Sequence, residues 1–233
     1  VYNRGQTVPI SAAMFNTGTK MFASKGFRLT ALFASLLMAF SMVAVDTAGN
    51  LYVAESVNHA VRKIMPTPGG SVGAVITVAG HSGTSGAVNA NGTAARFFQP
   101  EGVAVDGAGN VYVADFGNAS IRKIAPNGDV TTVAGGMGTT PVYGYIDGSV
   151  AVAKFQGPNG VTALPDGSLL VADYYNHALR KITATGYVLT LAGGNGSGHE
   201  NGTGLGIKFN GPSQIAFAPD GRLNVADQNN HVL

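Results

Sequence analysis

The segment Val111-Tyr-Val-Ala-Asp115 decides the fold, because variants of it recur along the chain. The copies are Leu51-Tyr-Val-Ala-Glu55, Leu169-Leu-Val-Ala-Asp173 and Leu223-Asn-Val-Ala-Asp227. An Asn stands three residues after each copy, and in the first three repeats Arg-Lys-Ile and then Thr-Val-Ala-Gly or Thr-Leu-Ala-Gly follow. Self-similarity at a period of 50 to 60 residues is typical of repeat architectures, so the chain is predicted to be a row of similar units.

Each repeat predicts four short strands, which we call a, b, c and d. Gly-containing turns such as Asp106-Gly-Ala-Gly109 join a to b and favour tight hairpins. One such sheet cannot bury both faces alone, but sheets stacked around an axis cover each other. We therefore expect an all-β protein, a β-propeller with about 3.5 four-stranded blades in an incomplete ring. The predicted divisions are an atypical segment (1–40), blade 1 (41–99), blade 2 (100–157), blade 3 (158–211) and a partial blade 4 (212–233).

A Phe precedes strand a in three repeats, and a Pro follows it three residues later. These pairs are Phe97 with Pro100, Phe155 with Pro158 and Phe209 with Pro212. We expect the Phe to fill the seam between neighbouring blades.

These motifs resemble the NHL repeat, which is named for an Asn-His-Leu triplet. The corresponding triplets are Asn58-His-Ala, Asn118-Ala-Ser, Asn176-His-Ala and Asn230-His-Val, so the Leu is never present. The resemblance covers residues 43–233. It implies blades around a central channel, commonly six in number.

Composition narrows the function classes. From Asp46 onward the chain has 10 Lys and Arg against 12 Asp and Glu, so the repeats are nearly neutral and no nucleic-acid partner is expected. Cysteine is absent, which excludes disulfides and thiolate metal sites.

The first 40 residues differ from the repeats. Basic residues up to Arg28 precede a mostly apolar run from Leu29 to Met42, as in a secretory signal or membrane-targeting segment. On this basis an extracellular or periplasmic location is expected. A non-native start and a structured helix are the alternatives.

The main functional hypothesis is a non-enzymatic binding scaffold for a protein, peptide or glycan, without a cofactor or metal. In an up-and-down sheet, the b–c turns and the long d–a connections lie at one end, where recognition residues are expected. The candidates are Tyr143, Tyr145, Asp147, Tyr174, Tyr175 and His177. The alternative is that the connections only pack blade against blade.

Two recurrent patterns are expected to serve the fold. The Asp of strand b, the next Asn and the following Arg recur as Asp115, Asn118 and Arg122. We expect these groups to cap the b–c turn and to form an ion pair. The turn histidines, His59, His177 and His231, are expected to hydrogen-bond within the turn rather than to bind metal.

The rival hypothesis is a metal-dependent lactonase. The stretch from Pro158 resembles gluconolactonase-type propellers, in which an Asn and acidic residues hold a divalent metal that activates water. By position, Glu101, Asn159 and Ser213 would stand at the channel mouth. The resemblance implies ligand roles for the first two, whereas Ser213 is a poor ligand.

Overall fold

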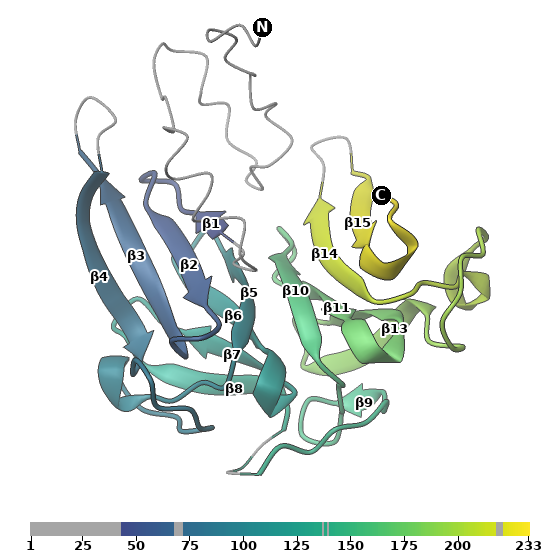
Figure 1. Ribbon diagram of the computed structural model, residues 1–233, viewed down its shortest axis with the longest axis horizontal. Helices are drawn as coiled ribbons and strands as arrows, with labels where there is room; N and C mark the ends of the chain where they lie inside the picture. Colours follow the sequence, from purple (N-terminus) through teal and green to yellow (C-terminus); the bar gives the residue numbers. More distant parts are fainter. Residues whose placement is uncertain (1–42, 68–71, 137, 139, 218–220) are drawn as a thin grey trace, which may run out of the picture.

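The computed structural model of the chain describes residues 43–67, 72–136, 138, 140–217 and 221–233. The segment predicted to be targeting-like, 1–40, lies outside these residues. The described residues form antiparallel β-sheets with short 3-10 helices between them, one sheet for each repeat (Figure 1). Within this part of the chain, no helix is long and apolar enough to cross a membrane.

The strands of each sheet pair in sequence order. Blade 1 comprises β1 (Val43–Val45), β2 (Leu51–Glu55), β3 (Ala60–Pro66) and β4 (Val72–Gly80). Blade 2 comprises β5 (Pro100–Val105), β6 (Val111–Asp115), β7 (Ser120–Ile124) and β8 (Val130–Gly135). Blade 3 comprises β10 (Pro158–Ala163), β11 (Leu169–Asp173), β12 (Ala178–Ile182) and β13 (Tyr187–Gly193). Blade 4 comprises β14 (Pro212–Phe217) and β15 (Leu223–Asp227).

The sheets fan around a common axis, with β1, β5, β10 and β14 innermost (Figure 1). The predicted all-β propeller of about 3.5 blades is therefore confirmed, and the described blades do not close a ring.

In blades 1 and 2, an Asp at the first position fixes the a–b hairpin. In blade 2, Oδ1 of Asp106 accepts hydrogen bonds from the backbone N–H groups of Ala108 and Asn110, at 3.0 and 2.9 Å. Gly109 takes the positive φ, 82°, that closes the turn. The side-chain acceptor replaces bonds that the turn backbone cannot make for itself.

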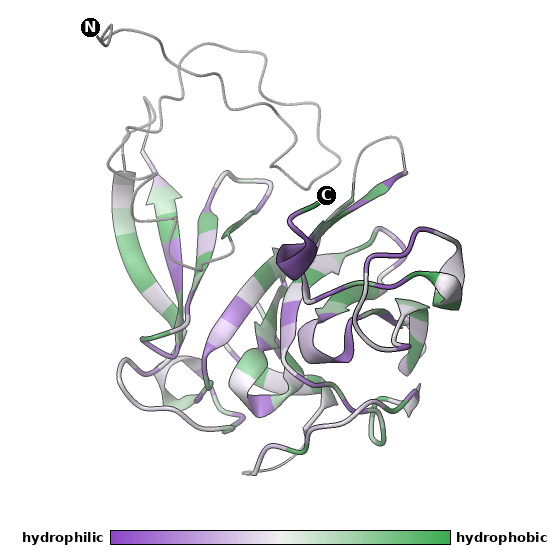
Figure 2. Ribbon diagram, turned by 45° about the vertical axis from the view of Figure 1, so that its right-hand side comes forward, coloured by the Kyte–Doolittle hydropathy of each residue, from purple (hydrophilic) through white to green (hydrophobic). Residues whose placement is uncertain are grey.

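Each predicted seam Phe lies between two blades. Phe97 is fully buried among residues of blades 1 and 2, and Phe155 among residues of blades 2 and 3. Phe209 packs on the cluster between blades 3 and 4. Blade 2 buries apolar residues on both faces, with Val111 and Val113 packed toward blade 1 and Ala114 and Ile121 toward blade 3. Hydrophobic residues are accordingly frequent along the strands (Figure 2).

The innermost strands approach so closely that glycine is required. A Cβ on Gly102 would lie 2.3 Å from the carbonyl oxygen of Asn159 in the next blade, and one on Gly160 would lie 2.6 Å from that of Ser213. Blade 4 has Gln214 at the same position, and its side chain is exposed. The glycines thus set the spacing of blades 2 to 4 at the axis.

In blades 2 and 3, a buried ion pair anchors the long connection that enters the blade. In blade 2, Oδ2 of Asp115 accepts hydrogen bonds from Arg122 (2.9 Å) and Asn118 (2.7 Å), and its Oδ1 accepts the N–H of Phe98 (2.8 Å). Arg122 also donates to the carbonyl oxygens of Val88 and of other connection residues. Burial raises the pKa of Asp115 to about 6, against the opposing effect of Arg122, so the carboxylate is mostly charged at neutral pH.

The same arrangement recurs in blade 3, where Asp173 accepts from Arg180 and Asn176, each at 2.7 Å. Our expectation that these groups cap the b–c turn itself was therefore wrong, because they bond to a different segment. The side chains reach past the turn to the incoming connection, because Arg is long enough to cover several carbonyl oxygens at once. The expected ion pair is present.

The connection between blades 2 and 3 adds an edge strand that sequence patterns did not predict. The short strand β9 (Gly148–Ser149) pairs antiparallel with the outer strand β13, through Ser149 with Tyr187 and Gly148 with Val188. Blade 3 therefore has five strands.

We predict that Gly102→Ala will lower the free energy of unfolding by about 1–3 kcal/mol, because the new methyl group overlaps backbone of the next blade. Gly107→Ala is the matched control, since a Cβ there meets nothing within 4 Å. Urea unfolding followed by circular dichroism measures both changes. Equal stability of the two variants would contradict the close approach of the inner strands.

We also predict that Asp115→Asn will cost about 3–5 kcal/mol of unfolding free energy, because it leaves the guanidinium of Arg122 buried without a counter-charge. The control is Glu55→Gln at the same place in blade 1, where the Glu55–Arg62 distance is 3.6 Å and both side chains are about one-third exposed. That change should cost less than about 1 kcal/mol. A similar loss in both variants would refute a special role for the buried pair.

Candidate functional site

The b–c turns and the long connections lie at one end of the blades, as predicted, and we call this end the turn face. The turns are 3-10 helices: η3 (Phe116–Asn118), η4 (Tyr174–Asn176) and η6 (Gln228–Asn230). Backbone hydrogen bonds join them to the connections, such as Gly117 N–H to the Phe98 carbonyl oxygen at 2.8 Å. Ion pairs and backbone bonds therefore present the turns and connections together on a rigid base.

Four aromatic side chains gather on this face between blades 2 and 4, and we call them the aromatic patch: Phe116, Tyr143, Tyr174 and Tyr175. Tyr143 and Tyr175 are 51% and 53% exposed. The ring of Tyr175 lies 5.8 Å from that of Phe116 and 5.0 Å from that of Tyr174, the latter in an edge-to-face arrangement. These contacts leave apolar ring surface facing solvent.

Hydrogen bonds fix two of these tyrosines. The hydroxyl of Tyr143 donates to the carbonyl oxygen of Gly117 at 3.0 Å, and that of Tyr174 donates to Oδ1 of Asn229 at 3.3 Å. The patch is therefore ordered before any partner arrives, which reduces the entropy lost on binding.

Two predicted binding residues, Tyr145 and Asp147, are instead engaged with Arg180 of blade 3. The guanidinium carbon lies 4.9 Å from the centre of the Tyr145 ring, and Oδ1 of Asp147 accepts from Arg180 at 2.7 Å. Asp147 also accepts from the backbone N–H of Thr190 at 2.9 Å. Both residues remain more than two-fifths exposed, but their contacts hold the connection on the blade.

His177 forms a bond between blades rather than within its turn, so our expectation was wrong here. Its Nδ1 accepts the N–H of Gly211, which leads into blade 4, at 3.1 Å. In blade 1, Nδ1 of His59 accepts the N–H of Gln99 in the same way, also at 3.1 Å. The left-handed backbone of these residues, φ 51° and 55°, turns the ring toward the next blade.

The channel-mouth candidates occupy equivalent β-bulges at the start of their inner strands. Pairing with strand b shifts register on either side of Glu101, Asn159 and Ser213. Glu101 accepts a hydrogen bond from Ser56 of blade 1 at 2.9 Å, and burial raises the pKa of its carboxyl despite that bond. The hydroxyl of Ser213 donates to the carbonyl oxygen of Ala226 at 3.3 Å.

Among these three residues, only Glu101 carries a carboxylate. Glu101 supplies one carboxylate, which already accepts from Ser56, and the hydroxyl of Ser213 is used by its own blade. Across the described parts of the chain, no three His, Asp or Glu side chains converge as metal ligands would.

Sequence reasoning missed Phe116 as a member of the aromatic patch. The available signal was its position, because it follows the strand-b Asp just as Tyr174 does in blade 3. Equivalent turn positions in neighbouring blades lie side by side on the same face, so one aromatic residue there should have drawn attention to the other.

Known proteins resemble the chain in its repeats. A family model described as the NHL repeat matches residues 97–124 and 155–182, in blades 2 and 3. The protein Suppressor of quenching 1, chloroplastic, from Arabidopsis thaliana is 33% identical over 155 residues, which are 62% of this chain and 15% of that protein. The human NHL repeat-containing protein 2 is 32% identical over 173 residues, 69% of this chain and 24% of that protein. The chain thus spans less than a quarter of the length of these curated relatives.

Solved structures with the same fold include a protein of unknown function from Bacteroides thetaiotaomicron, with a TM-score of 0.66 and 26% identity. That similarity covers 82% of this chain and 45% of the other. A gluconolactonase from Xanthomonas campestris has a TM-score of 0.52 and 15% identity, over 79% of this chain and 52% of that one, a likeness of fold alone. With the NHL-repeat model matching blades 2 and 3 and the sheets arranged around one axis, the chain contains NHL repeats and has the fold of an NHL-type β-propeller.

Proposed function

We propose that the chain is a binding scaffold whose turn face holds a protein, peptide or glycan. The observation that carries this proposal is the aromatic patch, in which Tyr143 of the connection and Tyr175 of blade 3 are exposed yet held by a hydrogen bond and by ring contacts with half-buried neighbours. Tyrosines supply large contact area with few rotatable bonds, and they are enriched where binding energy concentrates.

The surroundings of the patch favour a neutral partner surface. Asp147 beside it is paired with Arg180, and Asp115 and Asp173 are buried beneath the turns. The polar groups at the rim are amides, such as that of Asn229. Ring stacking and amide hydrogen bonds suit an extended peptide or a sugar chain.

The location of the protein and the identity of its partner remain predictions. A location outside the cytoplasm depends on residues 1–40, which lie outside the described part of the chain. A structure titled as an auxiliary nutrient binding protein, from Bacteroides thetaiotaomicron, has a TM-score of 0.60 at 18% identity, over 82% of this chain and 46% of that one, and supports the fold alone. Identification of the partner therefore depends on experiment.

We predict that Tyr175→Ala will weaken binding of a turn-face ligand at least about tenfold, because it removes the most exposed ring at the centre of the patch. The chain is screened against a displayed peptide library and a glycan array, and ligands found in either are retested by calorimetry. Tyr187→Ala is the control, since Tyr187 is 56% exposed but begins β13 at the opposite end of the blade. Ligands that respond to the control and not to Tyr175→Ala would place recognition elsewhere.

For the rival hydrolase, calorimetric titration with Ca²⁺ or Zn²⁺ is the decisive measurement. We expect no binding heat that depends on Glu101, because its carboxylate lies alone at the channel mouth among the described acidic and histidine side chains. Tight binding that Glu101→Ala abolishes would overturn the scaffold proposal in favour of a metal site.

A further inference from the structure

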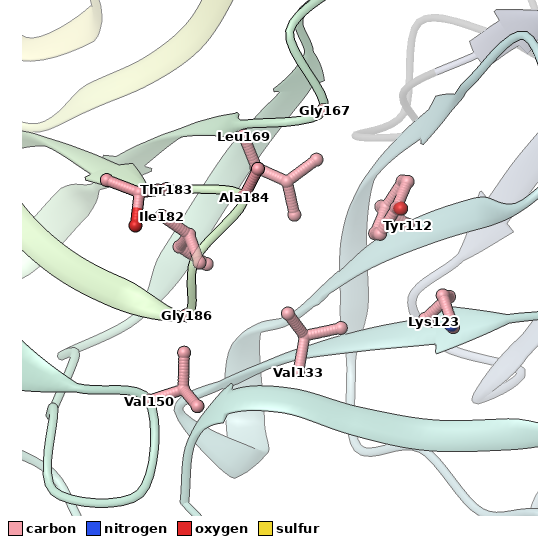
Figure 3. Close-up of a pocket in the computed structure, with 10 residues that line it drawn as sticks. All are labelled: Tyr112, Lys123, Val133, Val150, Gly167, Leu169, Ile182, Thr183, Ala184 and Gly186. Atoms are coloured by element: carbon pink, nitrogen blue, oxygen red, sulfur yellow. The ribbon is translucent and has the colours of Figure 1, made fainter.

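A groove lies between blades 2 and 3 near the end of the molecule opposite the turn face (Figure 3). It encloses about 230 Å³. On one side stand Tyr112, Lys123 and Val133 of blade 2, and on the other stand Leu169, Ile182 and the c–d turn of blade 3, with Val150 of the connection below them (Figure 3). The walls are mostly aliphatic, and one amino group lies among them.

The groove exists because blade 3 departs from the other blades at one position. The c–d turns of blades 1 and 2 carry Pro66 and Pro126, and the ring carbons of these residues lie next to Gly49 and Gly109. Blade 3 has Ala184 at this place, beside Gly167. The smaller side chain leaves space where the other blades place a proline ring.

Blade 2 also differs from its neighbours, because its strand-c lysine, Lys123, lacks the ion pair that the equivalent lysines form within the described part of the chain. Lys63 and Lys181, at the same strand position in blades 1 and 3, lie 3.9 Å from Asp46 and 3.3 Å from Asp166. Lys123 forms no ion pair with any residue that the structure describes, and it is half-buried in the groove. A half-buried lysine that forms no ion pair with the described residues favours an anion.

The nearby carboxylates are already satisfied, so they compete little for Lys123. Asp106 accepts from Asn110 at 2.8 Å and from the hydroxyl of Tyr112 at 3.1 Å. Burial, together with the charge of Asp106, raises the pKa of Tyr112 to about 12, so this phenol stays neutral. Asp166 at the far rim is bound by Ser168 and Lys181.

We propose that this groove binds a small carboxylate with an aryl or short acyl body. The apolar walls would cover the body, and Lys123 would pair with the carboxylate at the open side. The size of the groove sets the limit, because it is smaller than the usual pocket for a drug-sized ligand yet larger than a cavity that holds benzene. The site is independent of the turn face and of the partner proposed there.

Phenylacetate is the probe, and phenylacetamide is its neutral counterpart of nearly the same shape. Each is titrated into the nitrogen-labelled full chain while amide chemical shifts are followed. We expect phenylacetate to shift the amide signals of Val133, Leu169 and Ala184. Its affinity should be at least about fivefold higher than that of the amide, because only the acid can pair with Lys123.

Two variants test the two departures separately. Lys123→Met should remove the preference for the acid while leaving weak binding of the amide, and Ala184→Pro should weaken both ligands by narrowing the groove. The proline should be tolerated in the turn, since blades 1 and 2 carry it there. Lys63→Met in blade 1 is the matched control and should leave both affinities unchanged.

Equal affinity of acid and amide, an unchanged preference in Lys123→Met, or the absence of shifts at the groove with millimolar phenylacetate would each overturn the proposal. None of these outcomes bears on the aromatic patch, whose ligands are tested through Tyr175→Ala.

Discussion

The whole arrangement depends on each sheet burying an apolar face against the next one. A single four-stranded sheet of this size would leave both faces in water, and the hydrophobic effect drives the blades together around the axis. Phe97 and Phe155 complete this burial at two seams, each contributed by the connection that enters the following blade. Chain connectivity and core packing are therefore coupled, because the segment that links two blades also fills the space between them.

The turn face acquires its order from charge in addition to the apolar packing of Phe97 and Phe155. The connections are long and rich in small polar residues, so burial alone cannot fix them. The Asp–Arg pairs of blades 2 and 3 provide fixed donors and acceptors below them, and removal of one partner would leave an isolated charge in the interior. The aromatic patch is both exposed and ordered, because buried ion pairs hold the backbone beneath it.

The sequence predicted the repeats, the strands, the seam phenylalanines and the end of the blades at which turns and connections meet. These features follow from local patterns, such as the recurrence of Val111–Asp115 and the glycines of the hairpins. The targets of the long side chains could not be predicted in this way. Arg122 bonds to residues about 30 positions earlier, and the bond from His177 crosses to the next blade, so both depend on how the connections lie in space.

Short strand β9 also has a consequence for how the protein behaves in concentrated solution. Backbone groups left open along an outer strand can recruit strands from other molecules. In blade 3, β9 covers part of the outer edge of the sheet. In blade 1, no strand among the described residues pairs with the outer edge of β4, and its Val75 and Ile76 are 44% and 45% exposed. β4 is therefore one edge at which strands of other molecules could add, and a charged residue in place of Ile76 would oppose that addition.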